Sequence, residues 1–212
     1  VPVIRGVIFD MDGVMTDTER LFLTHWTRVL TERGYPPHPE VAAYCAGLNQ
    51  EAIDAYVYAV LGSDFDYPGI LKEIGIRMGR QIEADGVPVK PGLYELLDGL
   101  DRRGIPWAVA TSSALEHAAR RLRQIGVLHR LRGLIAGDMV SAGKPEPEIF
   151  LRAAETLGLP PQDCLVLEDS PHGILAARRA GCLPVMIPDL REPDAQTRKQ
   201  LYARIDSLAE VL

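Results

Sequence analysis

The chain has 212 residues, of which 47% are hydrophobic and 25% charged, and its length suggests one domain or one domain with an insertion. This composition is typical of globular proteins and argues against disordered, collagen-like and membrane-spanning classes. The net charge of −6 argues against nucleic acid or an anionic membrane as the main partner, because an acidic surface repels both.

Short apolar runs alternate along the chain with helical patterns, as in parallel βαβ units. We expect strands at 3–9, 105–110, 134–136, 164–167 and 183–187. Several of the segments between them carry apolar residues at helical spacing and end in glycine, a common C-terminal signal for helices. The expected fold class is therefore α/β, with a doubly wound (Rossmann-like) parallel sheet.

One long interval interrupts this alternation. Between residues 14 and 88 no segment is a convincing strand, and helical spacing dominates. The run 56–61 has strand propensity, but its apolar positions also fit one helix face, and we prefer the helix. We therefore expect a helical domain at 14–88, inserted into an α/β core made of residues 1–13 and 89–212.

Polar residues gather at the carboxyl ends of the predicted strands, which is where open parallel sheets bind ligands. They are Asp10 and Asp12 after the first strand, Thr111, Ser112 and Ser113 after the second, Lys144 beyond the third, and Glu168 and Asp169 at the fourth. Four carboxylates repel one another unless a cation lies among them. Because the set contains no His or Cys, the cation expected is a hard one, Mg²⁺.

The remaining residues at this edge suit a phosphate group. Ser113 and Glu116 have the spacing of a capping box, which would place Thr111 and Ser112 beside free backbone N–H groups. Lys144 would add positive charge for phosphoryl oxygens. A small phosphorylated metabolite is therefore the expected partner.

The residues Ser170 and Pro171 are typical of a helix start. This helix would begin directly after the acidic pair of the fourth strand. For Glu168, two interpretations stay open: a direct metal ligand, or a residue beside the ligands.

Four motifs in chain order, DMDGV (10–14), TS (111–112), KPEP (144–147) and ED (168–169), resemble those of the haloacid dehalogenase-like superfamily. The resemblance is to its branch of β-phosphoglucomutases and phosphatases, which carry a helical cap after the first strand. It covers the whole core in order, and the cap in position. It implies a phosphohydrolase in which Asp10 is the nucleophile that forms an aspartyl-phosphate and Asp12 is the general acid and base.

The same resemblance implies a ligand set. Mg²⁺ would be held by Asp10, the backbone carbonyl of Asp12 and Asp169, with Glu168 close to the ion. Thr111 and Lys144 would hold the phosphoryl group.

The expected substrate contacts are Thr18, Gly47, Gln50, Ser112 and Ser113. In the resembled mutases a His follows the Thr by four residues and an Arg follows the Gly by three, whereas this chain has Phe22 and Gln50 there. A mutase must hold a second phosphate in the cap, which requires a cation. We therefore expect hydrolysis of a small phosphate monoester, such as a sugar phosphate, rather than isomerisation.

Two alternatives stay open. Arg20, Arg77 or Arg80 could supply the cap cation of a mutase, although a solvated helix face is the simpler interpretation of each. A phospho-accepting signalling domain also uses an Asp, a Thr or Ser, a Lys and Mg²⁺, but it lacks a second Asp two residues on and a helical cap. Because the chain has three Cys without CxxC spacing and no recognisable signal peptide, we expect a cytoplasmic protein, and we expect it to be a monomer.

Overall fold

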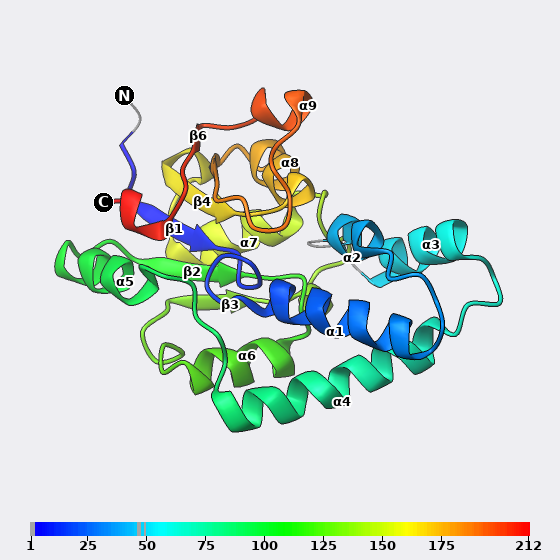
Figure 1. Ribbon diagram of the computed structural model, residues 1–212. Coiled ribbons are helices and arrows are strands. Elements are labelled where there is room, and N and C mark those ends of the chain that lie inside the picture. Colours follow the sequence, from blue (N-terminus) through cyan, green and yellow to red (C-terminus); the bar gives the residue numbers. More distant parts are fainter. Residues whose placement is uncertain (1–2, 46–47, 49) are drawn as a thin grey trace.

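The computed structural model describes residues 3–45, 48 and 50–212. Within these residues, six parallel strands form one sheet in the order β3-β2-β1-β4-β5-β6 (Figure 1). The strands are β1 (Gly6–Phe9), β2 (Trp107–Ala110), β3 (Gly133–Ile135), β4 (Cys164–Glu168), β5 (Leu183–Met186) and β6 (Ala203–Arg204). The doubly wound parallel sheet is confirmed, and β6 is a further strand that the sequence did not predict.

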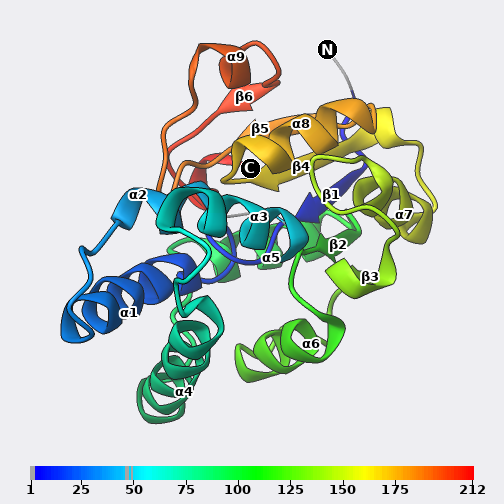
Figure 2. The same ribbon diagram turned by 90° about the vertical axis from the view of Figure 1, so that its right-hand side faces the viewer.

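Helices cover both faces of the sheet (Figure 2). Helices α5 (Leu93–Arg102) and α6 (Leu115–Gln124) pack with Val7 and Phe9 of β1 on one face. Helices α7 (Glu148–Leu157) and α8 (Pro171–Arg179) pack with Ile8 on the other. The central strand is therefore buried on both sides, as expected for a parallel sheet.

Short elements complete the core. They are the 3₁₀ turns η1 (Gly137–Met139), η2 (Pro161–Asp163) and η3 (Leu208–Glu210) and the helix α9 (Ala195–Arg198). In the described part of the chain, no helix combines the length and the apolar character needed to cross a bilayer.

Where the structure describes the chain between β1 and α5, it forms four helices: α1 (Thr18–Glu32), α2 (Pro39–Cys45), α3 (Gln50–Leu61) and α4 (Tyr67–Asp85). They share a separate hydrophobic cluster that includes Trp26, Leu30, Val57 and Ile74. The run 56–61 lies inside α3, so the helical interpretation is confirmed. The separate cluster supports the division into a cap at 14–88 and a core at 1–13 and 89–212, which stays a prediction.

The chain crosses between core and cap twice, and the two crossings lie side by side. Thr16 and Val89 form an antiparallel bridge. The backbone N–H of Asp17 donates to the carbonyl of Pro88 at 2.8 Å, and that of Lys90 donates to the carbonyl of Met15 at 3.0 Å. The first turn of α1 therefore begins next to the segment that returns to the core.

Candidate active site

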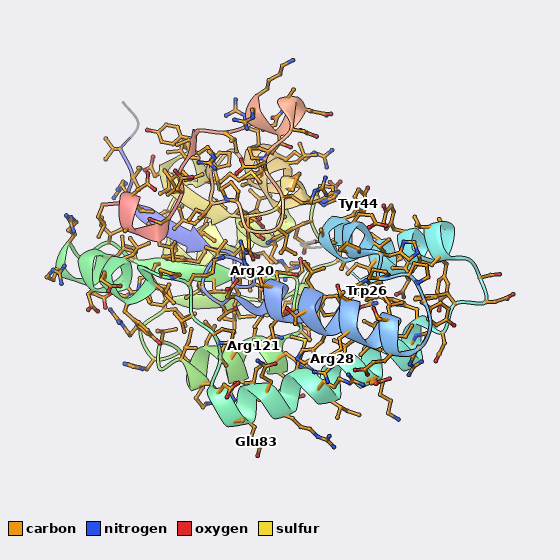
Figure 3. All side chains as sticks on the ribbon, viewed as in Figure 1. Arg20, Trp26, Arg28, Tyr44, Glu83 and Arg121 are labelled. Carbon is orange, nitrogen blue, oxygen red and sulfur yellow. The ribbon has the colours of Figure 1, made fainter. Side chains whose placement is uncertain are left out.

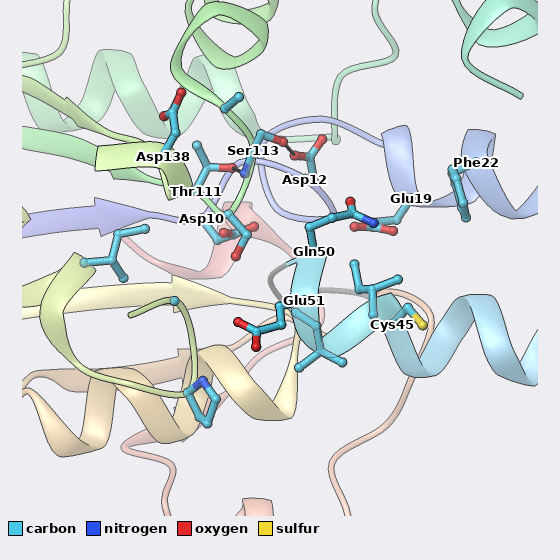
Figure 4. A pocket seen from close by; sticks show the side chains of 18 of the residues that line it. Asp10, Asp12, Glu19, Phe22, Cys45, Gln50, Glu51, Thr111, Ser113 and Asp138 are labelled. Atoms are coloured by element: carbon cyan, nitrogen blue, oxygen red, sulfur yellow. Dashed lines mark hydrogen bonds between the residues drawn. The ribbon is translucent and has the colours of Figure 1, made fainter. Parts of the chain in front are cut away.

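A cavity of about 880 Å³ opens where the cap faces the carboxyl ends of the strands. Its core side includes Asp10, Asp12 and the three residues Thr111, Ser112 and Ser113, and its cap side includes Glu19, Phe22 and Gln50 (Figure 4). The short loops after β1 and β2 bring these core residues together. Residues 100 positions apart in the sequence therefore share one wall.

Lys144 is fully buried and lies between two carboxylates. Its ammonium group donates to Oδ1 of Asp10, to Oε1 of Glu168 at 2.6 Å and to the carbonyl of Ala110 at 3.4 Å. The other oxygen of Glu168 accepts hydrogen bonds from the backbone N–H and the hydroxyl of Ser170, at 2.8 and 2.9 Å. Both oxygens of Glu168 thus have protein partners.

Ser170 is the N-cap of α8, which begins at Pro171 as the sequence predicted. Its hydroxyl oxygen accepts a hydrogen bond from the backbone N–H of Gly173 at 3.0 Å, which satisfies one donor of the first helical turn. This cap also fixes the position of the Ser170 groups that donate to Glu168.

Asp169, which follows β4, is buried and close to the loop after β1. A Cβ atom added to Gly13 would lie 2.2 Å from Oδ2 of Asp169, and the φ angle of Gly13 is +86°, which favours glycine. Any larger residue at this position would displace the carboxylate. Gly13 therefore allows Asp169 to approach the loop that carries Asp10 and Asp12.

The buried carboxylates carry an electrostatic cost. Burial raises the pKa of Asp10, Lys144 opposes this shift, and Glu168 adds to it. Burial also raises the pKa of Asp169, with further contributions from Glu168 and Asp10. A divalent cation would remove this cost, and an all-oxygen donor set suits Mg²⁺.

The described side chains do not include a preformed group of three Asp, Glu, His or Cys residues arranged around a metal position. The metal ligands implied by the resemblance are the side chains of Asp10 and Asp169 and the backbone carbonyl of Asp12. Three protein ligands leave further positions of a Mg²⁺ ion to a phosphate oxygen and water, which is how this ion is usually bound.

Asp12 is held by three donors, from α1, from α6 and from the loop after β2. Thr18 of α1 and Arg121 of α6 both donate to Oδ1, and the hydroxyl of Ser113 donates to Oδ2 at 2.9 Å. The sequence analysis did not predict Arg121, because one Arg on an amphipathic surface helix carries no signal for a partner 109 positions away. The three contacts fix the orientation of the Asp12 carboxylate.

The expected capping box at Ser113 and Glu116 is wrong. Helix α6 begins at Leu115 after Ala114, without a side-chain cap from Ser113. Asp138, from the 3₁₀ turn η1, accepts the hydrogen bond of the Leu115 backbone N–H at 3.0 Å instead. The hydroxyl of Ser113 donates to Asp12, which directs this side chain toward the cavity, and Ala114 takes the N-cap position of α6.

Thr111 directly follows β2, two residues before Ser113, and is almost fully buried. Its hydroxyl oxygen accepts a hydrogen bond from the backbone N–H of Ser113 at 3.1 Å. Ser112 lines the cavity between them. All three residues of this strand end are thus at the cavity, as the sequence predicted.

The expected substrate contacts from the cap have different positions. Thr18 donates to Asp12 and is not among the residues that line the cavity. Gln50 lines the cavity, and its side-chain amide also donates to Asp54 at 2.7 Å. Gly47 lies outside the described residues.

Glu19 is a cavity residue that the sequence analysis missed. Burial, with the nearby charges of Asp12 and Asp10, raises its pKa to about 8. Its position directly after Thr18, in the first turn of α1, was the only available signal.

Two of the three arginines considered as a cap cation pair with carboxylates that do not line the cavity. Arg20 pairs with Asp189, and Arg77 pairs with Glu32 and Glu73. Among the described residues that line the cavity, none is a Lys, Arg or His.

The comparison with known protein families agrees with this geometry. The model of the haloacid dehalogenase-like hydrolase family matches residues 4–181. The chain belongs to this family. Within the haloacid dehalogenase-like hydrolases, it is 32% identical over 197 residues to hexitol phosphatase A of Escherichia coli (strain K12), a match that covers 90% of this chain and 88% of that protein.

Two further relatives bear on the activity. The β-phosphoglucomutase of Bacillus subtilis (strain 168) is 28% identical over 187 residues, covering 85% of this chain and 82% of that protein. The crystal structure of a family hydrolase from Deinococcus radiodurans R1, with bound phosphate and sodium, has a TM-score of 0.79 and 29% identity and covers 100% of this chain and 94% of that one. This haloacid dehalogenase-like chain is a phosphohydrolase.

Proposed function

We propose that the protein is a Mg²⁺-dependent phosphatase that hydrolyses a small phosphate monoester, such as a sugar phosphate, through an aspartyl-phosphate on Asp10. The observation that carries this proposal is that Asp10 and Asp12 line the same cavity while each is oriented by its own donors. A nucleophile and a separate acid and base are the two groups that such a reaction needs.

In the first step, a carboxylate oxygen of Asp10 attacks phosphorus, and the bond from phosphorus to the leaving oxygen breaks. Asp12 gives a proton to that oxygen. In the second step, Asp12 takes a proton from water, the water oxygen attacks phosphorus, and the bond to Asp10 breaks, which releases phosphate and restores the carboxylate. Thr111 and Lys144 would orient the phosphoryl oxygens, with Ser112 and Ser113 beside them.

Asp10, the backbone carbonyl of Asp12 and Asp169 would hold Mg²⁺, which when bound supplies positive charge for the phosphoryl oxygens. The contacts of Glu168 with Lys144 and Ser170 favour a role beside the ligands rather than direct coordination. Glu168 would then keep Lys144 in place next to Asp10.

Hydrolysis is favoured over isomerisation by the cap side of the cavity. A mutase must grip a second phosphate there, and the described lining contains no cation to do so. Phe22 presents an apolar side chain to the cavity, and Gln50 is uncharged. The cytoplasmic location and monomeric state expected from the sequence stay predictions.

The test measures phosphate release from a panel of phosphorylated sugars, polyols and nucleosides, with Mg²⁺ and with EDTA. We expect turnover that requires Mg²⁺ and is inhibited by excess Ca²⁺, whose looser coordination spoils the alignment. Asp10→Asn should lower the rate by at least about a thousandfold, since an amide is a poor nucleophile. Full activity in EDTA after metal stripping would contradict the metal assignment, and an active Asp10→Asn would contradict the covalent route.

A further inference from the structure

Asp189 belongs to none of the motifs described above, and it lies in the loop after β5. Its side chain is fully buried. Oδ1 accepts hydrogen bonds from Nε of Arg20 at 2.6 Å and from Nζ of Lys90 at 2.9 Å. The backbone carbonyl of Asp189 also accepts from Nη2 of Arg20 at 3.1 Å. Arg20 therefore binds both the side chain and the backbone carbonyl of Asp189.

These contacts join three segments of the chain. Arg20 lies in the first turn of α1, where the cap meets the core (Figure 3). Lys90 lies in the segment that returns from cap to core, and Nζ of Lys90 is also 3.4 Å from Oδ1 of Asp17. Asp17 is the residue before α1, and its Oδ1 is 3.5 Å from Nε of Arg20. One buried core carboxylate thus ties both crossings to the start of the cap.

A solvated ion pair would be the simplest interpretation of Arg20, and exposed pairs contribute little to stability. The burial of Asp189 contradicts this interpretation. A buried carboxylate is costly unless it is fully paired, and Oδ2 of Asp189 has no hydrogen-bond partner within the described residues. Arg20 and Lys90, which both donate to Oδ1, offset the negative charge of Asp189 and hold its carboxylate in one position.

The turn that Asp189 anchors also carries two residues of the site. Thr18 donates to Oδ1 of Asp12, and Glu19 lines the cavity. Arg20 follows them directly, so a shift of Arg20 moves both. The hydroxyl of Thr18 can hold Asp12 only while this turn stays next to the loop after β1.

We propose that Asp189 is a positioning residue: through Arg20 it fixes the first turn of α1, so that Thr18 holds the Asp12 carboxylate in its working orientation. This inference rests on the proposed role of Asp12 as acid and base. It assigns to the loop after β5 a part in the reaction, although that loop supplies no group to the cavity.

The test compares Asp189→Asn with wild type on two substrates, p-nitrophenyl phosphate and an alkyl phosphate that the wild type hydrolyses. The alkyl leaving group needs a proton from Asp12, whereas p-nitrophenolate leaves without one. Both rates are measured in the first turnover, before the hydrolysis of the phosphoenzyme that the two esters share. We expect release of the alcohol from the alkyl ester to slow by at least about tenfold, the burst of p-nitrophenolate to slow much less, and KM to change little.

Arg20→Gln leaves Lys90 paired with Asp189 at 2.9 Å, so the buried carboxylate keeps a cation, and this variant should reproduce the same substrate ratio. The double variant should be no worse than Asp189→Asn, because that change already weakens the contact with Arg20. Asp163→Asn removes an ion pair with Arg5 at 3.5 Å, and it serves as the matched control that should keep the wild-type ratio.

The outcomes separate the two claims. If wild type releases no phosphate from either ester, the proposed function fails. If wild type is active and both Asp189→Asn and Arg20→Gln keep its substrate ratio, Asp189 has no positioning role. Equal losses on both esters, in parallel with a lower fraction of folded protein in urea, would show a purely structural role and overturn the inference.

Discussion

Lys144 and Glu168 form a fully buried ion pair, with 2.6 Å between Nζ and Oε1. The same ammonium group holds Oδ1 of Asp10. Two carboxylates therefore share one buried cation, and burial strengthens electrostatic interactions. Lys144 therefore contributes both to the stability of the fold and to the position of the proposed nucleophile, Asp10.

Lys144→Met should therefore lose stability and activity together. Removing one partner of a buried pair leaves the other charge uncompensated, which costs about 3–5 kcal/mol of unfolding free energy. Here Asp10 and Glu168 would also repel each other. Urea denaturation measures the first effect, and kcat at saturating Mg²⁺ measures the second.

A control lies in the loop that carries Lys144. Arg179 donates to the carbonyl of Pro145 and pairs with Glu146 at 2.7 Å, but both side chains are largely exposed. Arg179→Gln should change unfolding and kcat little. If Lys144→Met raised KM while kcat stayed intact, Lys144 would be a binding residue only.

Asp12→Asn should let the phosphoenzyme form from an activated ester and then block its hydrolysis. An Asn keeps the shape of the side chain but cannot take a proton from water, a function worth about 10²–10⁴-fold in rate. Rapid mixing with p-nitrophenyl phosphate should show a burst of p-nitrophenolate followed by a slow steady state. Unchanged steady-state rates on an alkyl phosphate would remove Asp12 from this role.

Thermal stability should depend on pH through the buried carboxylates. Burial, opposed by Lys144 and supported by Glu168, raises the pKa of Asp10 from the ordinary value of 3.8 to about 8. The folded protein thus binds more protons here than the unfolded chain does. The stability from Asp10 is fully present below pH about 4 and is lost as pH rises toward 8.

In metal-free protein, Tm should therefore fall as pH rises from 5 to 8, and the rise in Tm on adding Mg²⁺ should grow over the same range. Ion and protons compete for the same carboxylates. Differential scanning fluorimetry with and without Mg²⁺ measures both trends, and Asp163→Asn should follow the wild type. A Mg²⁺ effect that is equal at both pH values would show that the ion binds elsewhere.

Conversion of β-glucose 1-phosphate to glucose 6-phosphate, with a trace of the 1,6-bisphosphate, should be negligible beside phosphate release. The described cavity lining offers no cation for a second phosphate. Following both products in one reaction makes the comparison. If glucose 6-phosphate appears many times faster than phosphate, the phosphatase assignment is wrong.

Gln50→Arg is the converse experiment. A charged contact with phosphate contributes a few kcal/mol at most, and only if its geometry is already close. We expect tighter inhibition by hexose bisphosphates and nearly unchanged hydrolysis of simple monoesters. Gln50→Met, of similar size and without charge, should leave bisphosphate binding unchanged.

The strands that carry the site were predictable because each is a short apolar run followed by polar residues. Strand β6 was not, since Ala203 and Arg204 make only two residues and show no alternation. They become a strand by pairing with Val185 and Met186 of β5. Edge strands of this length depend on a neighbour that a local pattern does not contain.

The contacts that orient the site were harder to predict than its reactive residues. Arg121 reaches Asp12 across 109 positions, and Asp138 caps α6 from 23 positions away. Periodicity identifies faces and ends of elements, but it does not say which side chains of two distant elements will meet. The capping box at Ser113 failed for this reason: Asp138 accepts from the first turn of α6, and the hydroxyl of Ser113 donates to Asp12 instead.

The bridge between Thr16 and Val89 has a consequence for how such proteins diversify. Because the chain leaves the core and returns to it at neighbouring positions, the intervening segment can be exchanged for one of another length without moving any strand. Recombination or design can thus replace the wall that selects the alcohol while the carboxylates and the lysine stay where they are. Such an exchange has to keep the first turn of α1, because Thr18 of that turn holds Asp12.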